Sequence, residues 1–202
     1  MRKKIGVIVS GRGSNLQSII DHITEGKLDV EVAVVVSDHA DAFALERAAK
    51  AGIATAVVER KGYRDKEEFE DKIDAALRNA GAELVVLAGF MRILTGHFIS
   101  RWEHKIINIH PALLPSFKGL DAQGQAVDYG VKVAGCTVHF VDEGTDTGPI
   151  ILQKVVPVMD EDTEETLAAR ILVEEHKALP EAIRLWSEGK LSIKGRKVFV
   201  GK

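Results

Sequence analysis

Residues 6–15 read Gly-Val-Ile-Val-Ser-Gly-Arg-Gly-Ser-Asn, and this stretch decides the fold class. Residues 6–9 are apolar on both faces of an extended chain, which is typical of a strand buried inside a parallel sheet. After Asn15, apolar residues recur at helical spacing, at Leu16, Ile19, Ile20 and Ile23. The chain therefore begins with a buried strand, a turn that contains glycine, and a helix.

The same alternation of strand and helix continues through the first half of the chain. Short apolar and β-branched runs predict further strands, over residues 30–36, 55–58, 84–88 and 106–110. Amphipathic runs between them predict helices over residues 42–51 and 69–80. Apolar strands separated by helices predict an α/β fold, with a mostly parallel, Rossmann-like twisted sheet and helices on both of its faces.

From Pro111 the pattern changes and predicts an antiparallel C-terminal part. A loop-rich stretch leads to a short helix over 125–129, and the polar turn 142–149 separates strands over 133–141 and 150–158. We expect one domain over residues 1–202, with a βαβ half over 1–110 and a second part over 111–202.

A long helix is expected to start near Asp162 and to run toward Gly189. Asp162 and Glu165 have the spacing of a capping box, and Pro180 is expected to kink or break the helix. The runs 191–193 and 198–200 predict a small closing hairpin.

The composition excludes several classes of protein. The chain has 202 residues, of which 46% are apolar, and its 27 basic and 30 acidic residues give a formal net charge of -3. This near balance creates no positive field for nucleic acid. Residues 84–91 fall far short of the about 20 apolar residues that span a membrane, and residues 5–9 are too short for a secretion signal. The single cysteine, Cys136, forms no internal disulfide or paired metal site. We expect a soluble, cytoplasmic protein without a nucleic-acid, membrane or metal partner.

The turn Ser10–Asn15 has two interpretations. Free backbone N–H groups and the positive end of the helix favour a phosphate there, and glycine lets the backbone approach it closely. The third glycine of a dinucleotide fingerprint is replaced by Leu16, and the lysine of a P-loop is missing. The turn is either a tight turn with Ser or Asn capping the helix, or a cradle for one phosphate of a small substrate.

Asn108 and His110 lie two residues apart at the end of a predicted strand, so their side chains project from the same face. Open α/β sheets bind ligands at this carboxyl edge. A carboxamide can donate to a developing oxyanion, and an imidazole can move protons near neutral pH. The alternative is a core asparagine and a strand-end histidine that bind only backbone.

Two acidic residues are further candidates. Asp146 is either a solvated turn residue or a carboxylate that orients His110 and favours its charged form. Glu175 falls within an apolar stripe of the last long helix, where a carboxylate needs a partner or a wet pocket unless it reaches solvent at the edge. The other histidines, including His139, are less informative, and Cys136 is expected to be a small core residue.

Four motifs occur in a characteristic order: the turn Ser10–Asn15, residues 88–94 (AGFMRIL), residues 108–115 (NIHPALLP) and residues 146–150 (DTGPI). Together they resemble the phosphoribosylglycinamide formyltransferase family of the folate-dependent formyltransferase superfamily. The resemblance covers essentially the whole chain. It implies transfer of a formyl group from the co-substrate 10-formyltetrahydrofolate to glycinamide ribonucleotide in purine synthesis, by a monomer or homodimer.

The resemblance also implies roles for individual residues. Asn108, His110 and Asp146 would be catalytic. The phosphorylated substrate would contact Gly13, Ser14, Asn15 and, at its ribose, Glu175. The folate would contact Met91, Arg92, Ile93, Leu94, Asn108 and the loop Val141, Asp142, Glu143, Gly144, Thr145 and Asp146. Lys66 would meet the carboxylate tail of the folate. The 1–110 half would then be the phosphate-binding half, and 111–202 would carry the folate loop and the C-terminal helix.

One departure and three rivals remain. Members of the family commonly have histidine in the stretch 119–123, where this chain has Asp121 and Gln123. Formyltetrahydrofolate hydrolase normally has an N-terminal regulatory domain, for which a first strand near Ile5 is expected to leave no room. Methionyl-tRNA formyltransferase adds a C-terminal RNA-binding domain, against which the chain length and charge argue. A noncatalytic phosphate-binding module would use only the first turn.

Overall fold

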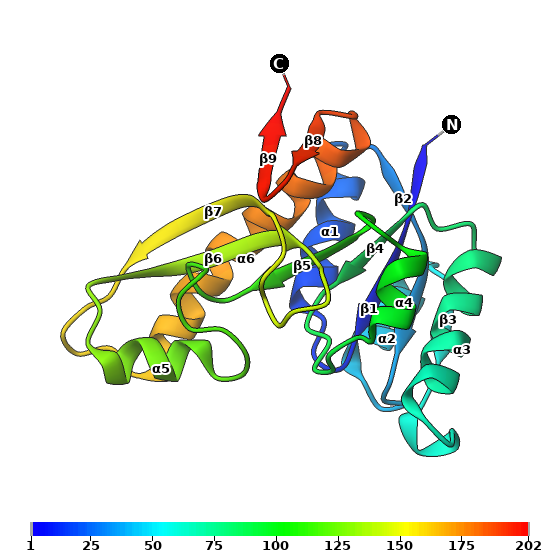
Figure 1. Cartoon of the computed structure of the whole chain (residues 1–202), viewed down its shortest axis with the longest axis horizontal. Coiled ribbons are helices and arrows are strands. Elements are labelled where there is room, and N and C mark those ends of the chain that lie inside the picture. Colours follow the sequence, from blue (N-terminus) through cyan, green and yellow to red (C-terminus); the bar gives the residue numbers. More distant parts are fainter. Residues whose placement is uncertain (1, 202) are drawn as a thin grey trace. The chain divides into compact units, whose positions relative to one another are not determined.

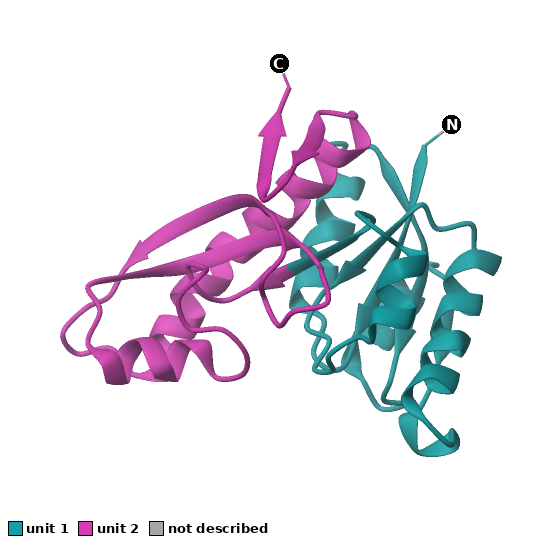
Figure 2. Ribbon diagram, viewed as in Figure 1, with its two compact units in different colours: residues 1–108 teal, residues 109–202 magenta. Residues whose placement is uncertain are grey.

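The computed structural model describes residues 2–201 and divides into two compact units (Figure 2). The first unit ends at Asn108 and the second begins at Ile109. The boundary lies inside strand β5 (Ile106–His110), so the last two residues of this strand belong to the second unit. No helix within residues 2–201 is both long and apolar enough to span a membrane.

The first unit has a parallel sheet with the strand order β3-β2-β1-β4-β5. Its strands are β1 (Lys3–Val9), β2 (Val30–Ser37), β3 (Thr55–Val57), β4 (Leu84–Leu87) and β5. The central strand β1 pairs with β2 on one side and β4 on the other, with Val7 opposite Val35 and Val86. These three valines are fully buried, which is why the strands read as continuous apolar runs.

Helices connect the strands of the first unit (Figure 1): α1 (Ser14–Thr24), α2 (Phe43–Lys50), the short 3-10 turn η1 (Arg60–Gly62), α3 (Lys66–Asn79) and α4 (Gly96–Arg101). The strand order reverses after β3, so right-handed crossovers place α1 and α2 on one face of the sheet and α3 and α4 on the other. Consistently, α1 packs against α2 and α3 packs against α4. The switch point of the sheet lies between β1 and β4.

The second unit combines antiparallel strands with one long helix (Figure 1). Its elements are α5 (Ala122–Tyr129), β6 (Val133–Phe140), β7 (Ile150–Pro157), α6 (Glu164–Ser187), β8 (Leu191–Lys194) and β9 (Lys197–Val200). β6 and β7 are antiparallel, and α6 packs along both of them. Leu167, Ile171, Leu179 and Ile183 form the buried stripe of α6. β8 and β9 form the predicted hairpin.

The predicted fold class is confirmed: a mostly parallel sheet is flanked by helices and is followed by antiparallel strands toward the C-terminus. Helix α4 was not predicted, because its six residues are too few to show a period. The expected capping box at Asp162 and Glu165 is wrong. Thr163 is the N-cap of α6, and its side chain and that of Thr166 form the box instead.

Pro180 does not break α6, which continues for 24 residues. Proline removes one helical N–H donor, and the expectation of a break rested on that loss. Pro180 and its neighbours Ala178 and Leu179 are buried, and the packing of α6 on β6 and β7 holds the helix together. Tertiary packing therefore outweighs the local cost of the proline.

Candidate functional site

In the first unit, the turn after β1 meets the segment after β4 at the switch point of the sheet. The N–H of Ser10 donates to the carbonyl oxygen of Gly89 over 3.1 Å, and the Ser10 hydroxyl accepts from the N–H of Met91 over 3.1 Å. Two of the predicted binding segments therefore lie side by side where α/β sheets bind ligands.

The turn itself is shaped by Gly13. Its φ of 68° lies in the left-handed region, and an added Cβ would approach the Cβ of Ala44 to 2.6 Å. Gly13 is also the N-cap of α1, so the N-cap supplies no side-chain oxygen to the first turn of the helix. The interpretation in which Ser14 or Asn15 is the N-cap is wrong. Arg47 supports the turn by donating to the carbonyl oxygen of Arg12 over 2.9 Å.

The segment 89–95 presents two apolar side chains to solvent. Met91 is 65% exposed and Ile93 is 60% exposed, whereas Leu94 is buried. Arg92 forms an ion pair with Asp38, in which Nε lies 2.5 Å from Oδ2. An exposed apolar pair on a segment that is fixed elsewhere is typical of a binding surface.

The remaining candidates of the first unit lie on regular elements. Lys66 is the first residue of α3, after the N-cap Asp65. Asn108 is half-buried on β5, in register with Leu87 of β4. Asn108 and His110 follow the predicted alternation along this strand.

His110 belongs to the second unit, where it is buried, and each of its ring nitrogens faces an oxygen atom of the same unit. Nε2 lies 2.8 Å from the carbonyl oxygen of Phe117, and Nδ1 lies 3.4 Å from Oδ2 of Asp146. Carbonyl and carboxylate oxygens only accept hydrogen bonds, so the imidazolium form, with N–H at both positions, satisfies both partners. His110 and Asp146 thus meet, which sequence spacing left open.

Asp146 is held from several sides. Its carboxylate accepts from the N–H of Gly119 over 2.8 Å, and Oδ1 lies 3.6 Å from Nε2 of His139. Burial raises the pKa of the Asp146 carboxyl, but the hydrogen bonds from His139 and Gly119, with the charges of both histidines, outweigh burial and hold the pKa below its usual value. Asp146 is therefore an anion at neutral pH.

His139 is the residue that sequence reasoning missed. It is 2% exposed on β6, and its Nδ1 lies 2.8 Å from the carbonyl oxygen of Phe140. Its two nitrogens therefore also face two oxygens, one of which belongs to Asp146. The available signal was a histidine inside a strand that is otherwise apolar and buried, where a polar side chain needs a partner.

Both partners of His110 have a strained backbone. Phe117, Asp121 and Asp146 have φ angles of 52°, 55° and 50°, in the left-handed region that residues other than glycine rarely adopt. Phe117 and Asp146 are the two partners of His110. Such strain persists only where the surroundings impose it, and it is concentrated at functional sites.

The predicted folate loop, residues 141–146, is tied back on itself. Oδ1 of Asp142 accepts from the N–H of Gly144 over 3.1 Å and from the hydroxyl of Thr147 over 2.5 Å. An added Cβ at Gly148 would approach the carbonyl oxygen of Phe140 to 1.7 Å, so the chain after Asp146 has room only for glycine. This close passage fixes the course of the loop.

Glu175 lies on the buried face of α6, so the interpretation in which it reaches solvent at the edge of the stripe is wrong. Burial, and after it the negative charge of Glu175, raises the pKa of the Cys136 thiol to about 12. Cys136 is fully buried, as expected for a small core residue.

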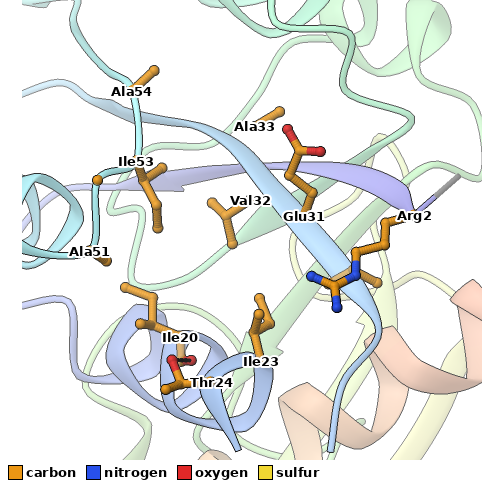
Figure 3. A pocket seen from close by; sticks show the side chains of 12 residues that line it. Arg2, Ile20, Ile23, Thr24, Glu31, Val32, Ala33, Ala51, Ile53 and Ala54 are labelled. Atoms are coloured by element: carbon orange, nitrogen blue, oxygen red, sulfur yellow. Dashed lines mark hydrogen bonds between the residues drawn. The ribbon is translucent and has the colours of Figure 1, made fainter. Parts of the chain in front are cut away.

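No group of three His, Cys, Asp or Glu residues suited to a metal ion is found in the chain from residue 2 to residue 201. A groove of about 530 Å³ in the first unit is lined by Ile20, Ile23, Val32 and Ile53, among others (Figure 3). β2 begins at Val30, so this groove lies near the amino ends of the strands. The candidate residues of the first unit that follow β1 and β4 lie at the carboxyl ends.

Comparison with known proteins finds relatives along the whole chain. The model of the formyl transferase family matches residues 3–183. The phosphoribosylglycinamide formyltransferase of Haemophilus influenzae is 42% identical over 98% of this chain and 93% of its own length. The trifunctional purine biosynthetic protein adenosine-3 of Chironomus tentans is 47% identical over 93% of this chain, which spans 14% of that protein.

A solved structure is similarly close. Glycinamide ribonucleotide transformylase 1 from Symbiobacterium toebii has a TM-score of 0.98 and 50% sequence identity, and the match covers 100% of this chain and 95% of that chain.

Proposed function

The chain belongs to the formyl transferase family, and from this membership we propose that it transfers the formyl group of 10-formyltetrahydrofolate to the amine of N1-(5-phospho-D-ribosyl)glycinamide, a step of purine biosynthesis. The observation that carries the proposal is the buried pair of His110 and Asp146, 3.4 Å apart at the end of β5. A protein that only binds phosphate has no use for such a pair. The names of the relatives that match over nearly their full length support the same substrate.

The phosphate of the acceptor is assigned to the turn Gly13–Asn15. The backbone N–H groups at the start of α1 and the positive end of this helix favour an anion there, and the N-cap Gly13 has no side chain to occupy the space. Glu175 is assigned to the ribose, because a buried carboxylate can accept hydrogen bonds from sugar hydroxyls.

The folate is assigned to the segment Met91–Leu94, Asn108 and the loop 141–146. The exposed apolar side chains of Met91 and Ile93 offer surface to a flat ring, and the fixed backbone beside them offers donors and acceptors. Lys66, at the start of α3, is assigned to the carboxylate tail of the folate.

The co-substrate supplies the formyl group, whose carbon forms a bond with the amine nitrogen while its bond to the folate nitrogen breaks. One amine proton ends on the folate nitrogen. His110 and Asn108 donate hydrogen bonds to the formyl oxygen as negative charge develops on it. In the structure, Nε2 of His110 lies 2.8 Å from the carbonyl oxygen of Phe117. When substrate binds, the formyl oxygen replaces this carbonyl oxygen as the hydrogen-bond acceptor of Nε2. Asp146 orients His110 through Nδ1, and the pair carries a proton from the amine nitrogen to the folate nitrogen.

The decisive experiment follows folate product formation by purified protein, with and without the phosphorylated amine. We expect product only when the amine is present. Formyl loss that does not depend on the amine would establish the hydrolase instead, and binding of the phosphorylated amine without turnover would establish a noncatalytic module.

Four further properties accompany the proposal. The reaction requires no metal, so a chelator is expected to leave the rate unchanged. The protein acts as a monomer or homodimer in the cytoplasm, and it acts as one domain with a phosphate-binding half over 1–110 and a folate-loop part over 111–202. Sedimentation of the purified chain tests whether it is a monomer or a homodimer.

A further inference from the structure

Polar contacts at three points fix the segment 89–95 inside the first unit. At its start, the N–H of Ser10 binds the carbonyl oxygen of Gly89. At its end, the N–H of Thr95 donates to Oε1 of Glu70 over 2.9 Å, and the Thr95 hydroxyl donates to the other carboxylate oxygen. Between these points, Arg92 reaches Asp38. The exposed pair Met91 and Ile93 therefore lies on a stretch that is anchored on both sides and in the middle.

Asp38 is the central group of this arrangement. Its side chain is 1% exposed, although it directly follows strand β2 at the carboxyl edge of the sheet. Oδ2 lies 2.5 Å from Nε of Arg92, and Oδ1 lies 2.9 Å from Nδ1 of His39. The Ser10 hydroxyl donates to the same carboxylate and accepts from the N–H of Met91. One buried carboxylate thus joins the chain after β1, β2 and β4.

Asp38 carries its charge at neutral pH. Burial raises the pKa of this carboxyl, but the hydrogen bonds from Ser10, Arg92 and His39 outweigh burial and hold the pKa below its usual value. A charge-assisted bond to a guanidinium is shorter and about twice as strong as a bond between neutral groups. The Arg92 side chain is 37% exposed, and its guanidinium also lies 5.8 Å from the ring centre of Phe69.

We propose that Asp38 is a positioning residue for the folate: through Arg92 and Ser10 it holds the backbone of residues 91–94 in the shape that binds the ring system. The inference rests on the proposed function, because it takes the ligand of this segment from there. Asp38 itself touches no substrate. Asp38 therefore affects the affinity for folate rather than the reacting groups, because a shift of about 1 Å in the backbone of residues 91–94 displaces a surface that binds the folate.

The test is Asp38→Asn, which keeps the shape of the side chain and removes its charge. We expect KM for 10-formyltetrahydrofolate to rise about tenfold, with kcat changed less than about threefold and KM for the phosphorylated amine less than about twofold. Calorimetric titration with tetrahydrofolate should show a matching rise in Kd of about tenfold, independent of turnover.

Asp74→Asn is the matched control. Asp74 is also a poorly exposed, ion-paired aspartate of the first unit, with Arg78 at 2.9 Å and the indole nitrogen of Trp102 at 2.7 Å. It lies on α3, and its partners Arg78, Arg101 and Trp102 all lie outside the segment 89–95. Asp74→Asn should lower the melting temperature and leave folate affinity unchanged. A similar loss of folate affinity in both variants, or none in Asp38→Asn, overturns the proposal.

Two additions complete the test. If Asp38 acts through Arg92, the double variant Asp38→Asn, Arg92→Met should raise the folate Kd by less than the product of the two fold changes measured in the single variants. If Asp38→Asn does not fold, Ser10→Ala is the variant to measure. It removes the hydroxyl that links Asp38 to Met91 and keeps the ion pair of Asp38 with Arg92. An unchanged folate Kd in Ser10→Ala overturns the proposal. Absence of formyl transfer in the unmodified protein instead overturns the proposed function.

Discussion

Replacing Asp146 by asparagine removes one charge from the buried histidine pair and nearly preserves its shape. The amide oxygen can still accept from the N–H of Gly119, which donates to the carboxylate over 2.8 Å. The amide NH₂ group then faces Nε2 of His139, which lies 3.6 Å from the carboxylate. The variant therefore loses the attraction for a charged His110 and adds a donor where an acceptor stood.

The magnitude follows from the distance of 3.4 Å between Nδ1 of His110 and Oδ2 of Asp146. At an effective dielectric constant of about 20, two unit charges at this distance attract by about 5 kcal/mol. The amide recovers about 1–1.5 kcal/mol as a neutral hydrogen bond. A loss of about 3–4 kcal/mol corresponds to a fall in kcat of about 10²–10³.

The assay is steady-state formyl transfer at pH 7.5 with both substrates saturating, beside a circular-dichroism melt of the same preparation. We expect a melting curve that remains cooperative and KM values within about threefold of those of the unmodified protein. A kcat within about threefold of the unmodified value, in a folded variant, would refute the role of the charge.

The same variant tests the pKa of Asp146. Because the folded-state pKa lies below the unfolded value of about 3.9, the charge stabilises the fold above that pH, and the stabilisation is lost as pH falls through the folded pKa. The contribution of the Asp146 charge to the difference in unfolding free energy between the unmodified protein and Asp146→Asn should therefore be present at about pH 5 and shrink below about pH 4. Urea unfolding at both of these pH values measures it, and a difference that grows toward acid pH would contradict the direction of the pKa shift.

Three other perturbations have distinct signatures. Gly13→Ala places a Cβ 2.6 Å from that of Ala44 and should raise KM for the phosphorylated amine far more than KM for the folate. Gly11→Ala is the control, because its Cβ would meet nothing within 4 Å and should change neither KM. Equal effects of Gly13→Ala on both substrates would contradict the phosphate assignment. His139→Gln leaves the charge of Asp146 in place but loosens its position, so kcat should fall about tenfold with KM unchanged, and a wild-type kcat would show that His139 only fills space. Cys136, with a pKa of about 12, should hold only about 10⁻⁴ of its thiol as thiolate at pH 8 and resist alkylation until the protein is unfolded in urea; rapid reaction in the native state would contradict its burial.

The spacing of apolar residues was sufficient to predict the strands and most of the helices. Residues 6–9 and 84–87 are apolar on every side, and only a strand covered on both faces of a sheet satisfies them, so the α/β class follows without any knowledge of distant contacts. Where the pattern was short or ambiguous, prediction failed. Helix α4 has six residues, and the N-cap of α6 lies one residue later than expected because Thr163 competes with Asp162 for the same role.

For the candidate site too, local pattern predicted some features and missed others. The shared face of Asn108 and His110 follows from the period of a strand, and the anion-binding character of the turn before α1 follows from helix chemistry. Sequence spacing left open whether Asp146 meets His110, and the sequence did not indicate that His139 lies on the other side of Asp146 or that Asp38 binds Arg92.

Strand and helix positions were determined by the sequence itself, because burying a periodic apolar face in a regular element is favourable whatever the rest of the chain does. The partners of Asp146 and Asp38 were decided only by the tertiary structure. Irregular segments have no period, and their course depends on contacts between residues far apart in the chain, such as the passage of Gly148 beside the carbonyl oxygen of Phe140 and the hold of Asp38 on Arg92.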